Sequence, residues 1–223
     1  LIIQDGIRRM YVENESIFYY LTVYNENYAM PKMPETDTIR EGVLKGMYKY
    51  HASERNDDAP RAQLLGSGPL VREACKAAKV LEEHYGVAAN VWSVTSYKEL
   101  RRDALETGRW NLLHPNEAPR VPYVAQCTQG EQGVFVAASD YLKVLPEAIA
   151  RWLPGQLVAL GTDGFGRSDT RAALRGHFEI DHRFIVLAAL HALAKEGRLE
   201  WDAVKRAIKN LDIDPDKINP MSW

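Results

Sequence analysis

The sequence predicts an α/β fold, in which helices flank both faces of a mostly parallel sheet to give three layers. Over residues 61–223, short apolar segments alternate with longer segments of helical periodicity. Parallel strands require long crossover connections, and the helices in these connections cover the sheet. The 223 residues are 46% hydrophobic and 26% charged, which is typical of a globular protein with enough apolar surface to form a core.

The charge balance argues against a general nucleic-acid-binding protein. Lys and Arg number 28 and Asp and Glu number 30, whereas such proteins carry a basic excess. No apolar run approaches the roughly 20 residues that span a bilayer, and the first residues do not form a signal peptide. The two cysteines, Cys75 and Cys127, make neither a disulfide framework nor a metal cluster. We therefore expect a cytoplasmic protein with no membrane or nucleic-acid partner.

The first thirty residues predict a helix followed by a strand. The chain begins with Leu1-Ile2-Ile3, which is typical of the interior of a buried segment, so we expect a piece of a longer protein. Residues 5–13 have one apolar face and predict a short helix. Residues 17–24 are rich in β-branched and aromatic side chains and predict a buried strand.

Residues 31–60 predict a connection. Pro31, Pro34 and Pro60 are separated by charged residues, which argues against a core segment. Within this stretch, residues 39–45 predict one or two helical turns and residues 47–51 predict a strand.

Residues 61–223 contain the repeating strand and helix pattern. Pro69 and Gly86 suit the two ends of one helix, and Ser96 with Glu99 three residues later is a capping box for the next. Residues 123–126 and 134–138 are too close for a helical crossover, so one of them is expected to run antiparallel. The predicted strands are 62–65, 91–94, 123–126, 134–138 and 157–160. The predicted helices are one that begins near Pro69 and ends at Gly86, one that begins after Ser96, and 141–153, 170–178, 181–196 and 200–211.

The turn Gly66-Ser67-Gly68 occupies the position of a dinucleotide-binding loop, between a strand and a helix. The third glycine of such a loop is replaced by Val71, and no acidic residue ends the strand at residues 91–94. A tight structural turn is therefore favoured over a nucleotide site.

The most unusual segment is the 161–169 loop, Gly-Thr-Asp-Gly-Phe-Gly-Arg-Ser-Asp. It follows a strand and precedes a helix, where open α/β sheets bind ligands. Asp163, Arg167 and Asp169 are its candidate site residues. Arg167 could hold a carboxylate or phosphate, while Ser168 or Asp169 could cap the helix at Thr170. A structural or interface role is favoured over direct ligand contact.

Other chemistry-bearing residues have simpler interpretations. His177, Asp181 and His182 could bind a metal, but Asp181 suits the cap of the helix that starts there. Cys75 lies on an apolar helical face and Cys127 ends a predicted strand, and neither has a His partner in the sequence pattern. No catalytic, cofactor-binding or metal-binding residue is assigned.

Four polar or aromatic residues, Asn25, Glu26, Asn27 and Tyr28, follow the predicted strand at residues 17–24. They either line a cleft or begin the connection.

Taken together, several motifs resemble the C-terminal end of the homodimeric, bacterial-type pyruvate dehydrogenase family within the transketolase superfamily. The resemblance covers the whole chain. It is carried by Asp5-Gly6-Ile7-Arg8-Arg9-Met10-Tyr11, Tyr20-Leu21-Thr22, Asn25-Glu26-Asn27-Tyr28-Ala29-Met30-Pro31, Leu64-Leu65-Gly66-Ser67-Gly68, Ser93-Val94-Thr95-Ser96, Arg109-Trp110-Asn111-Leu112-Leu113-His114-Pro115, Leu160, and the 161–169 loop.

This resemblance implies a division of the chain and a role. Residues 1–30 would be the tail of the pyrimidine-binding domain, 31–60 the linker, and 61–223 the transketolase-like C-terminal domain. The family uses thiamine diphosphate and Mg²⁺ to decarboxylate pyruvate and to acetylate a lipoyl group reductively. Its cofactor and metal ligands would lie outside this chain, so none is expected here and the chain alone should be inactive.

The resemblance also implies partners and site residues. The partners would be the remaining domains, a second subunit of a homodimer, and the lipoyl-bearing dihydrolipoamide acetyltransferase. Asn25 would replace an arginine that grips a sugar phosphate in transketolase, which suits pyruvate. The active-site rim or interface candidates are Asn25, Glu26, Asn27, Tyr28, Asp163, Arg167 and Asp169, and an apolar patch is expected near residues 19–28 and the 161–169 loop.

Two alternatives remain. The chain could come from another thiamine-dependent enzyme of the superfamily, or it could be a free-standing binding or dimerisation module.

Overall fold

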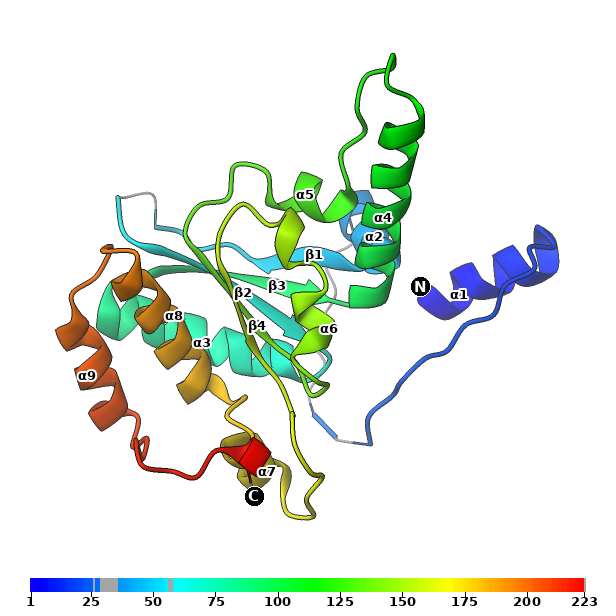
Figure 1. Cartoon of the computed structure of the whole chain (residues 1–223). Helices are drawn as coiled ribbons and strands as arrows, with labels where there is room; N and C mark the ends of the chain where they lie inside the picture. The colour runs from blue at the N-terminus through cyan, green and yellow to red at the C-terminus, as the bar shows by residue number, and fades with distance from the viewer. Residues whose placement is uncertain (26, 29–35, 56–57, 223) are drawn as a thin grey trace.

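The computed structural model describes residues 1–25, 27–28, 36–55 and 58–222. In this part of the chain, a five-stranded sheet lies between two helical layers (Figure 1). The strand order is β1-β3-β2-β4-β5, and the predicted three-layer α/β class is confirmed. The strands are β1 (Met47–His51), β2 (Arg61–Ser67), β3 (Ala88–Val94), β4 (Val134–Ala138) and β5 (Leu157–Leu160).

The only antiparallel pairing among the described strands joins β1 to β3 at one edge of the sheet. β2, β3, β4 and β5 are parallel to one another. The expectation that residues 123–126 or 134–138 run antiparallel is therefore wrong. Since β1 lies within residues 31–60, part of the expected connection contributes a strand to the sheet.

Helices precede, connect and follow the strands. Their bounds are α1 (Ile2–Ile7) with a π-helical turn (Arg8–Val12), α2 (Asp37–Lys45), α3 (Leu70–Tyr85), α4 (Tyr97–Leu113), α5 (Tyr123–Thr128), α6 (Val144–Glu147), a 3₁₀ turn (Ala150–Trp152), α7 (Arg171–His177), α8 (His182–Lys195), α9 (Trp201–Asn210) and a last 3₁₀ turn (Pro220–Ser222). None of these helices is long and apolar enough to cross a bilayer.

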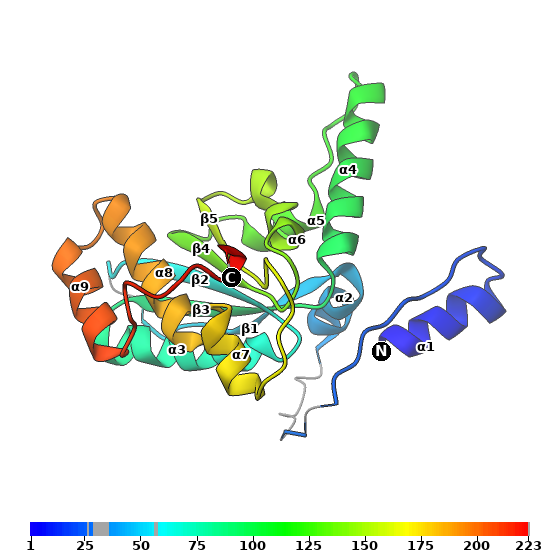
Figure 2. The same ribbon diagram turned by 60° about the horizontal axis from the view of Figure 1, so that its bottom comes forward.

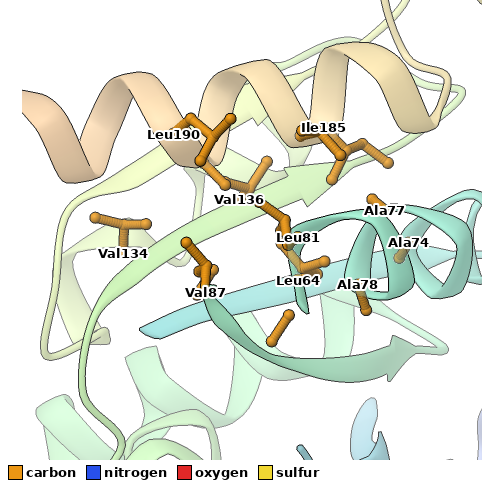
Figure 3. Close-up of a cluster of buried hydrophobic side chains, with 14 of the residues drawn as sticks. Leu64, Ala74, Ala77, Ala78, Leu81, Val87, Val134, Val136, Ile185 and Leu190 are labelled. Atoms are coloured by element: carbon orange, nitrogen blue, oxygen red, sulfur yellow. The ribbon is translucent and has the colours of Figure 1, made fainter. Parts of the chain in front are cut away.

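The larger core lies between one face of the sheet and helices α3, α8 and α9. Leu64 of β2 and Val136 of β4 point into it, and Leu81 of α3 and Leu190 of α8 pack against them (Figure 3). All four side chains are buried. This packing makes α8, which is far from α3 in the sequence, an integral part of the same core.

The second core lies on the opposite face. Leu65 and Phe135, next in sequence to strand residues of the larger core, point into it with Trp92 of β3. Leu100 of α4 and Ile149 cover them. Alternation of buried side chains across the sheet is expected where both faces are covered, because successive strand residues point to opposite sides.

A polar contact also joins α3 to α8 inside the helical layer. The main-chain N–H of His182 donates to Glu73 Oε2 over 3.1 Å, and His182 Nδ1 lies 3.2 Å from the same oxygen. Lys76 Nζ donates to Glu73 Oε1 over 2.7 Å. Burial alone would raise the pKa of Glu73, but these hydrogen bonds outweigh it and lower that pKa to about 2.

The predicted helix ends are largely confirmed. Gly86 follows α3 with φ of 66°, the left-handed conformation that glycine adopts without strain. Ser96 Oγ accepts from Glu99 N–H at the start of α4, and Asp181 accepts from two N–H groups at the start of α8. The cap of α7 is Thr170 itself, which accepts from Ala173 N–H, so the proposed capping by Ser168 or Asp169 is wrong.

Residues 123–126 form part of helix α5, so the predicted strand is wrong. Val124 and Thr128 are buried four residues apart, which is a helical spacing. Tyr123 begins the helix by donating its N–H to Asp103 Oδ2 over 2.7 Å. Cys127 therefore lies in a helix and does not end a strand.

The predicted helix at residues 141–153 is also wrong in extent, since the chain forms only α6 and a 3₁₀ turn there. Pro146 has no N–H to donate to the carbonyl of Leu142, which prevents a regular start at Tyr141. The 3₁₀ turn brings Ile149 and Trp152, three residues apart, toward the second core.

The N-terminal helix is confirmed but begins earlier than expected, at Ile2. The buried strand at residues 17–24 is wrong: this segment pairs with no strand among the described residues. Phe18 is 85% exposed and Val23 is 89% exposed. Both views show α1 apart from the sheet (Figures 1 and 2).

Candidate functional site: the carboxyl edge of the sheet

The candidate site lies at the carboxyl ends of the parallel strands β2, β4 and β5. This end of the sheet is called the carboxyl edge below. Ser67 Oγ donates to Ser139 Oγ over 3.2 Å, which joins the residues at the ends of β2 and β4. The N–H of Ser139 donates to the carbonyl of Leu160, the last residue of β5, over 3.0 Å. Hydrogen bonds therefore join the residues from which the connections after β2, β4 and β5 start. In open α/β sheets, such connections bind ligands.

Tyr24 brings the N-terminal segment to this edge. Its hydroxyl donates to Asp140 Oδ1 over 3.0 Å, just beyond the end of β4. Its ring lies against Gly68, at the start of α3, where an added Cβ would be only 2.8 Å from the ring. Burial, followed by the Asp140 carboxylate, raises the pKa of the Tyr24 hydroxyl, so it remains a proton donor at neutral pH.

Two of the four predicted residues that follow Tyr24 also contact the sheet domain. Asn25 Oδ1 accepts from the guanidinium of Arg171 at the start of α7. The guanidinium of Arg72 in α3 lies 4.8 Å from the centre of the Tyr28 ring, a cation–π distance. Asn27 is exposed, and Glu26 lies outside the described residues.

The contact of Asn25 changes one interpretation made from the sequence. An asparagine at this position suggested a site without a cation. The structure places the Arg171 guanidinium directly against Asn25, so positive charge is present beside it. The identity of residue 25 alone consequently does not distinguish a phosphate-bearing substrate from a small oxo acid.

The first half of the 161–169 loop is hydrogen-bonded to residues at the same edge. Thr162 donates its N–H to the carbonyl of Tyr141 over 2.9 Å and its hydroxyl to the carbonyl of Asp140 over 3.0 Å. Asp163 Oδ2 accepts from the N–H of Lys143 over 3.1 Å. Asp140 thus contacts Tyr24 through its side chain and the loop through its main chain.

The second half of the loop faces a different space. Arg167 and Asp169 line a cavity of about 540 Å³ together with His177 of α7 and Lys217 of the C-terminal segment. Asp163 lines a smaller cavity of about 190 Å³. Phe165, at the tip of the loop, is 76% exposed.

The structure therefore gathers some of the predicted site residues and separates others. Asn25, Tyr28 and Asp163 border the carboxyl edge of the sheet, whereas Arg167 and Asp169 face the larger cavity. The sequence pattern did not predict the contacts that hold them there, which involve Tyr24, Gly68, Arg72, Asp140 and Arg171. For Gly68 and Asp140, the position in the sequence could have predicted the contact, because each follows a parallel strand and the carboxyl ends of these strands lie together.

The Gly66-Ser67-Gly68 turn has a structural explanation. A Cβ on Gly66 would lie 2.6 Å from Val71 Cα, so Gly66 permits close packing of α3 against β2. The space over Gly68 is filled by the ring of Tyr24. Both glycines make room for protein groups, as expected for a tight turn.

The other candidate groups are occupied by internal contacts. Asp181 is ion-paired with Arg183 over 2.8 Å, and His182 contacts Glu73. Burial raises the pKa of both Cys75 and Cys127, which disfavours the reactive thiolate. Within the described ranges, no three His, Cys, Asp or Glu side chains are grouped to hold a metal ion.

Comparison with known proteins gives the family. A family model described as the transketolase-like TK C-terminal domain matches residues 46–181. The chain belongs to this family. A second model, described as the pyruvate dehydrogenase E1 component middle domain, matches residues 1–31 of this transketolase-like chain.

Curated relatives agree with the resemblance seen in the sequence, which is confirmed. The chain is 47% identical to the pyruvate dehydrogenase E1 component of Cupriavidus necator, over 100% of this chain and 25% of that protein. It is 48% identical to that of Pseudomonas aeruginosa, over 99% of this chain and 25% of the relative. It is 47% identical to that of Escherichia coli K12, over 99% of this chain and 24% of the relative. The chain thus spans about a quarter of the length of these relatives.

Solved transketolases are also similar to this chain. The structure from Leishmania mexicana has a TM-score of 0.46 and 19% identity, covering 70% of this chain and 19% of that one. A transketolase structure from Pichia stipitis has a TM-score of 0.48 and 18% identity, covering 70% of this chain and 19% of that one.

Proposed function

We propose that this transketolase-like chain is the C-terminal part of a pyruvate dehydrogenase E1 component. The observation that carries the proposal is identity of 47–48% to such components along essentially the whole chain. The succession of a middle-domain match and a C-terminal-domain match supports it. The complete protein would decarboxylate pyruvate and transfer the acetyl unit reductively to a lipoyl group.

The chain itself would act as a structural and dimerisation domain at the entrance to the active site. Residues 1–30 would complete the pyrimidine-binding domain, residues 31–60 would form the connection, and residues 61–223 would form the C-terminal domain. Asn25, Glu26, Asn27, Tyr28, Asp163, Arg167 and Asp169 would form its rim or interface. The contacts of Tyr24, Asn25 and Tyr28 with the carboxyl edge support this placement.

Thiamine diphosphate and Mg²⁺ would be bound by other parts of the longer protein. The ring of Tyr24 over the glycine turn, where a phosphate group would approach, supports this placement. The exposed apolar side chains of the N-terminal segment and the loop tip, including Phe18, Tyr20, Val23 and Phe165, support contact with the remaining domains. Further proposed partners are a second subunit and the lipoyl-bearing acetyltransferase, in the cytoplasm.

The decisive experiment compares the longer protein that contains this chain with the chain alone. Calorimetric titration with thiamine diphosphate in the presence of Mg²⁺ should show saturable binding to the longer protein and no heat with the 223-residue chain. Saturable binding to the chain alone would overturn the domain assignment.

An activity assay then tests the substrate. The longer protein should release CO₂ from pyruvate and acetylate a lipoyl domain, and a panel of larger 2-oxo acids and ketose phosphates serves as the control. Turnover of a panel member with no turnover of pyruvate would assign the chain to another enzyme of the superfamily.

A further inference from the structure

We propose that Tyr24, Gly68 and Asp140 form an anchor that positions Asn25 and Tyr28 on the carboxyl edge of the sheet. These three residues, called the Tyr24 anchor below, come from the N-terminal segment, the turn after β2 and the turn after β4. All three act by positioning other residues. Only the expected effect of the anchor on turnover of pyruvate rests on the proposed function.

Gly68 is suited to this contact in two independent ways. Its φ of +53° lies in the left-handed region, which strains any residue with a side chain. An added Cβ would also lie 2.8 Å from both Cε2 and the hydroxyl oxygen of Tyr24. The atoms in the way belong to the end of one aromatic side chain, so a methyl group at residue 68 would displace Tyr24 before it disturbed the strand.

Displacing Tyr24 would break its hydrogen bond to Asp140. This bond, over 3.0 Å, joins residues 116 positions apart in the sequence. The carbonyl of Asp140 accepts from the hydroxyl of Thr162 over 3.0 Å, so the same residue is fixed to the start of the 161–169 loop. The Tyr24 anchor therefore connects the two segments that the sequence singled out, through one side chain and one carbonyl.

The anchor contains the first residue of the N-terminal segment that hydrogen-bonds to the sheet domain. Before it, Phe18, Tyr20 and Val23 extend into solvent, with exposed fractions of 85%, 86% and 89%. Leu21 is 43% exposed and Tyr24 is 40% exposed. After it come the contacts of Asn25 with Arg171 and of Tyr28 with Arg72. The hydrogen bond of Tyr24 to Asp140 therefore precedes these two contacts along the segment.

The first test measures backbone order by ¹⁵N relaxation in the 223-residue chain itself. The variants are Gly68→Ala and Tyr24→Phe, which removes only the hydroxyl. Gly197→Ala is the matched control, because Gly197 also has a positive φ, +69°, but has no atom within 4 Å of an added Cβ. Order parameters of residues 24, 25, 27 and 28 should fall below about 0.6 in Gly68→Ala, fall less in Tyr24→Phe, and keep the wild-type value in Gly197→Ala.

Unchanged order parameters in both Gly68→Ala and Tyr24→Phe would overturn the proposal. An equal loss in Gly197→Ala and Gly68→Ala would also overturn it, because the effect would then belong to left-handed glycine and not to the Tyr24 contact. If Gly68→Ala does not fold, Asp140→Ala, which removes the acceptor, and Tyr24→Phe, which removes the donor, test the same hydrogen bond.

The second test uses the longer protein. Tyr24→Phe should lower kcat/KM for pyruvate by about twofold to tenfold, the value of one hydrogen bond, mainly by raising KM. Thiamine diphosphate binding should not change. A longer protein that is inactive on pyruvate would contradict the proposed function, while the relaxation measurement would still decide the anchor. An unchanged KM with lowered order parameters would overturn the link between the anchor and turnover.

Discussion

β4 and the N-terminal segment of residues 17–24 have similar compositions and opposite environments. Both are rich in β-branched and aromatic residues. Every residue of β4 is buried, because β2 and β5 pair with it and helices cover both faces. In the N-terminal segment, Tyr19 packs back on Gly6 of α1, whereas Phe18 and Val23 are almost fully exposed. A composition rich in β-branched and aromatic residues therefore favours a strand. Whether the segment is buried depends on whether neighbouring strands pair with it and helices cover it.

The largest expected difference between the two regions is in stability. Leu64→Ala removes a fully buried side chain from the larger core and should lower the free energy of unfolding by about 2–5 kcal/mol. Urea denaturation measures this change. Leu112→Ala is the control, since that side chain is 79% exposed and the expected change is within about 0.5 kcal/mol. Similar changes for the two variants would contradict the assignment of Leu64 to a packed core.

A smaller effect is expected from the polar contact that joins α3 to α8. The pKa of Glu73 is lowered to about 2, below the value of about 4.3 in an unfolded chain. Its carboxylate therefore stabilises the fold above about pH 4.3, and this contribution is lost as the pH falls from about 5 toward 2. Glu73→Gln should cost about 2–3 kcal/mol at pH 7 and flatten the stability curve below pH 5.

Unfolding measured at several pH values from 2 to 7 tests this prediction. Glu83→Gln on the exposed side of α3 is the control and should leave the curve almost parallel to that of the wild type. If Glu73→Gln also gives a parallel curve, the carboxylate does not have the assigned role.

The smallest effect is expected in the N-terminal segment. Phe18→Ser replaces an 85% exposed aromatic residue and should change the free energy of unfolding by no more than about 0.5 kcal/mol. It should reduce the binding of an apolar dye to the chain, because it removes exposed apolar surface. A loss above 1 kcal/mol would show that Phe18 is packed and would remove the contrast with β4.

Most of the fold could be predicted from the sequence because its signals are local. The caps at Ser96 and Asp181 and the end of α3 at Gly86 depend on side chains within a few residues. Residues 123–126 were misassigned because a four-residue apolar run has no resolvable period, and the burial of Thr128 completes the helical spacing.

The candidate site could be predicted only in its location. The rule that ligand sites lie at the carboxyl ends of parallel strands correctly placed the 161–169 loop at this edge. Contacts such as Tyr24 with Gly68, or Asn25 with Arg171, join residues far apart in the sequence. No local pattern reports them, because they depend on how the extended N-terminal segment lies against the folded sheet.

The packing of α8 on α3 has a consequence for protein synthesis. Glu73 and His182 are 109 residues apart, and α8 completes the cover that α3 begins on the face of the sheet that contains Leu64. At typical translation rates, α8 emerges roughly 5–20 s after α3. During that interval the nascent chain presents apolar surface that α8 later covers, and such surface is where aggregation can begin.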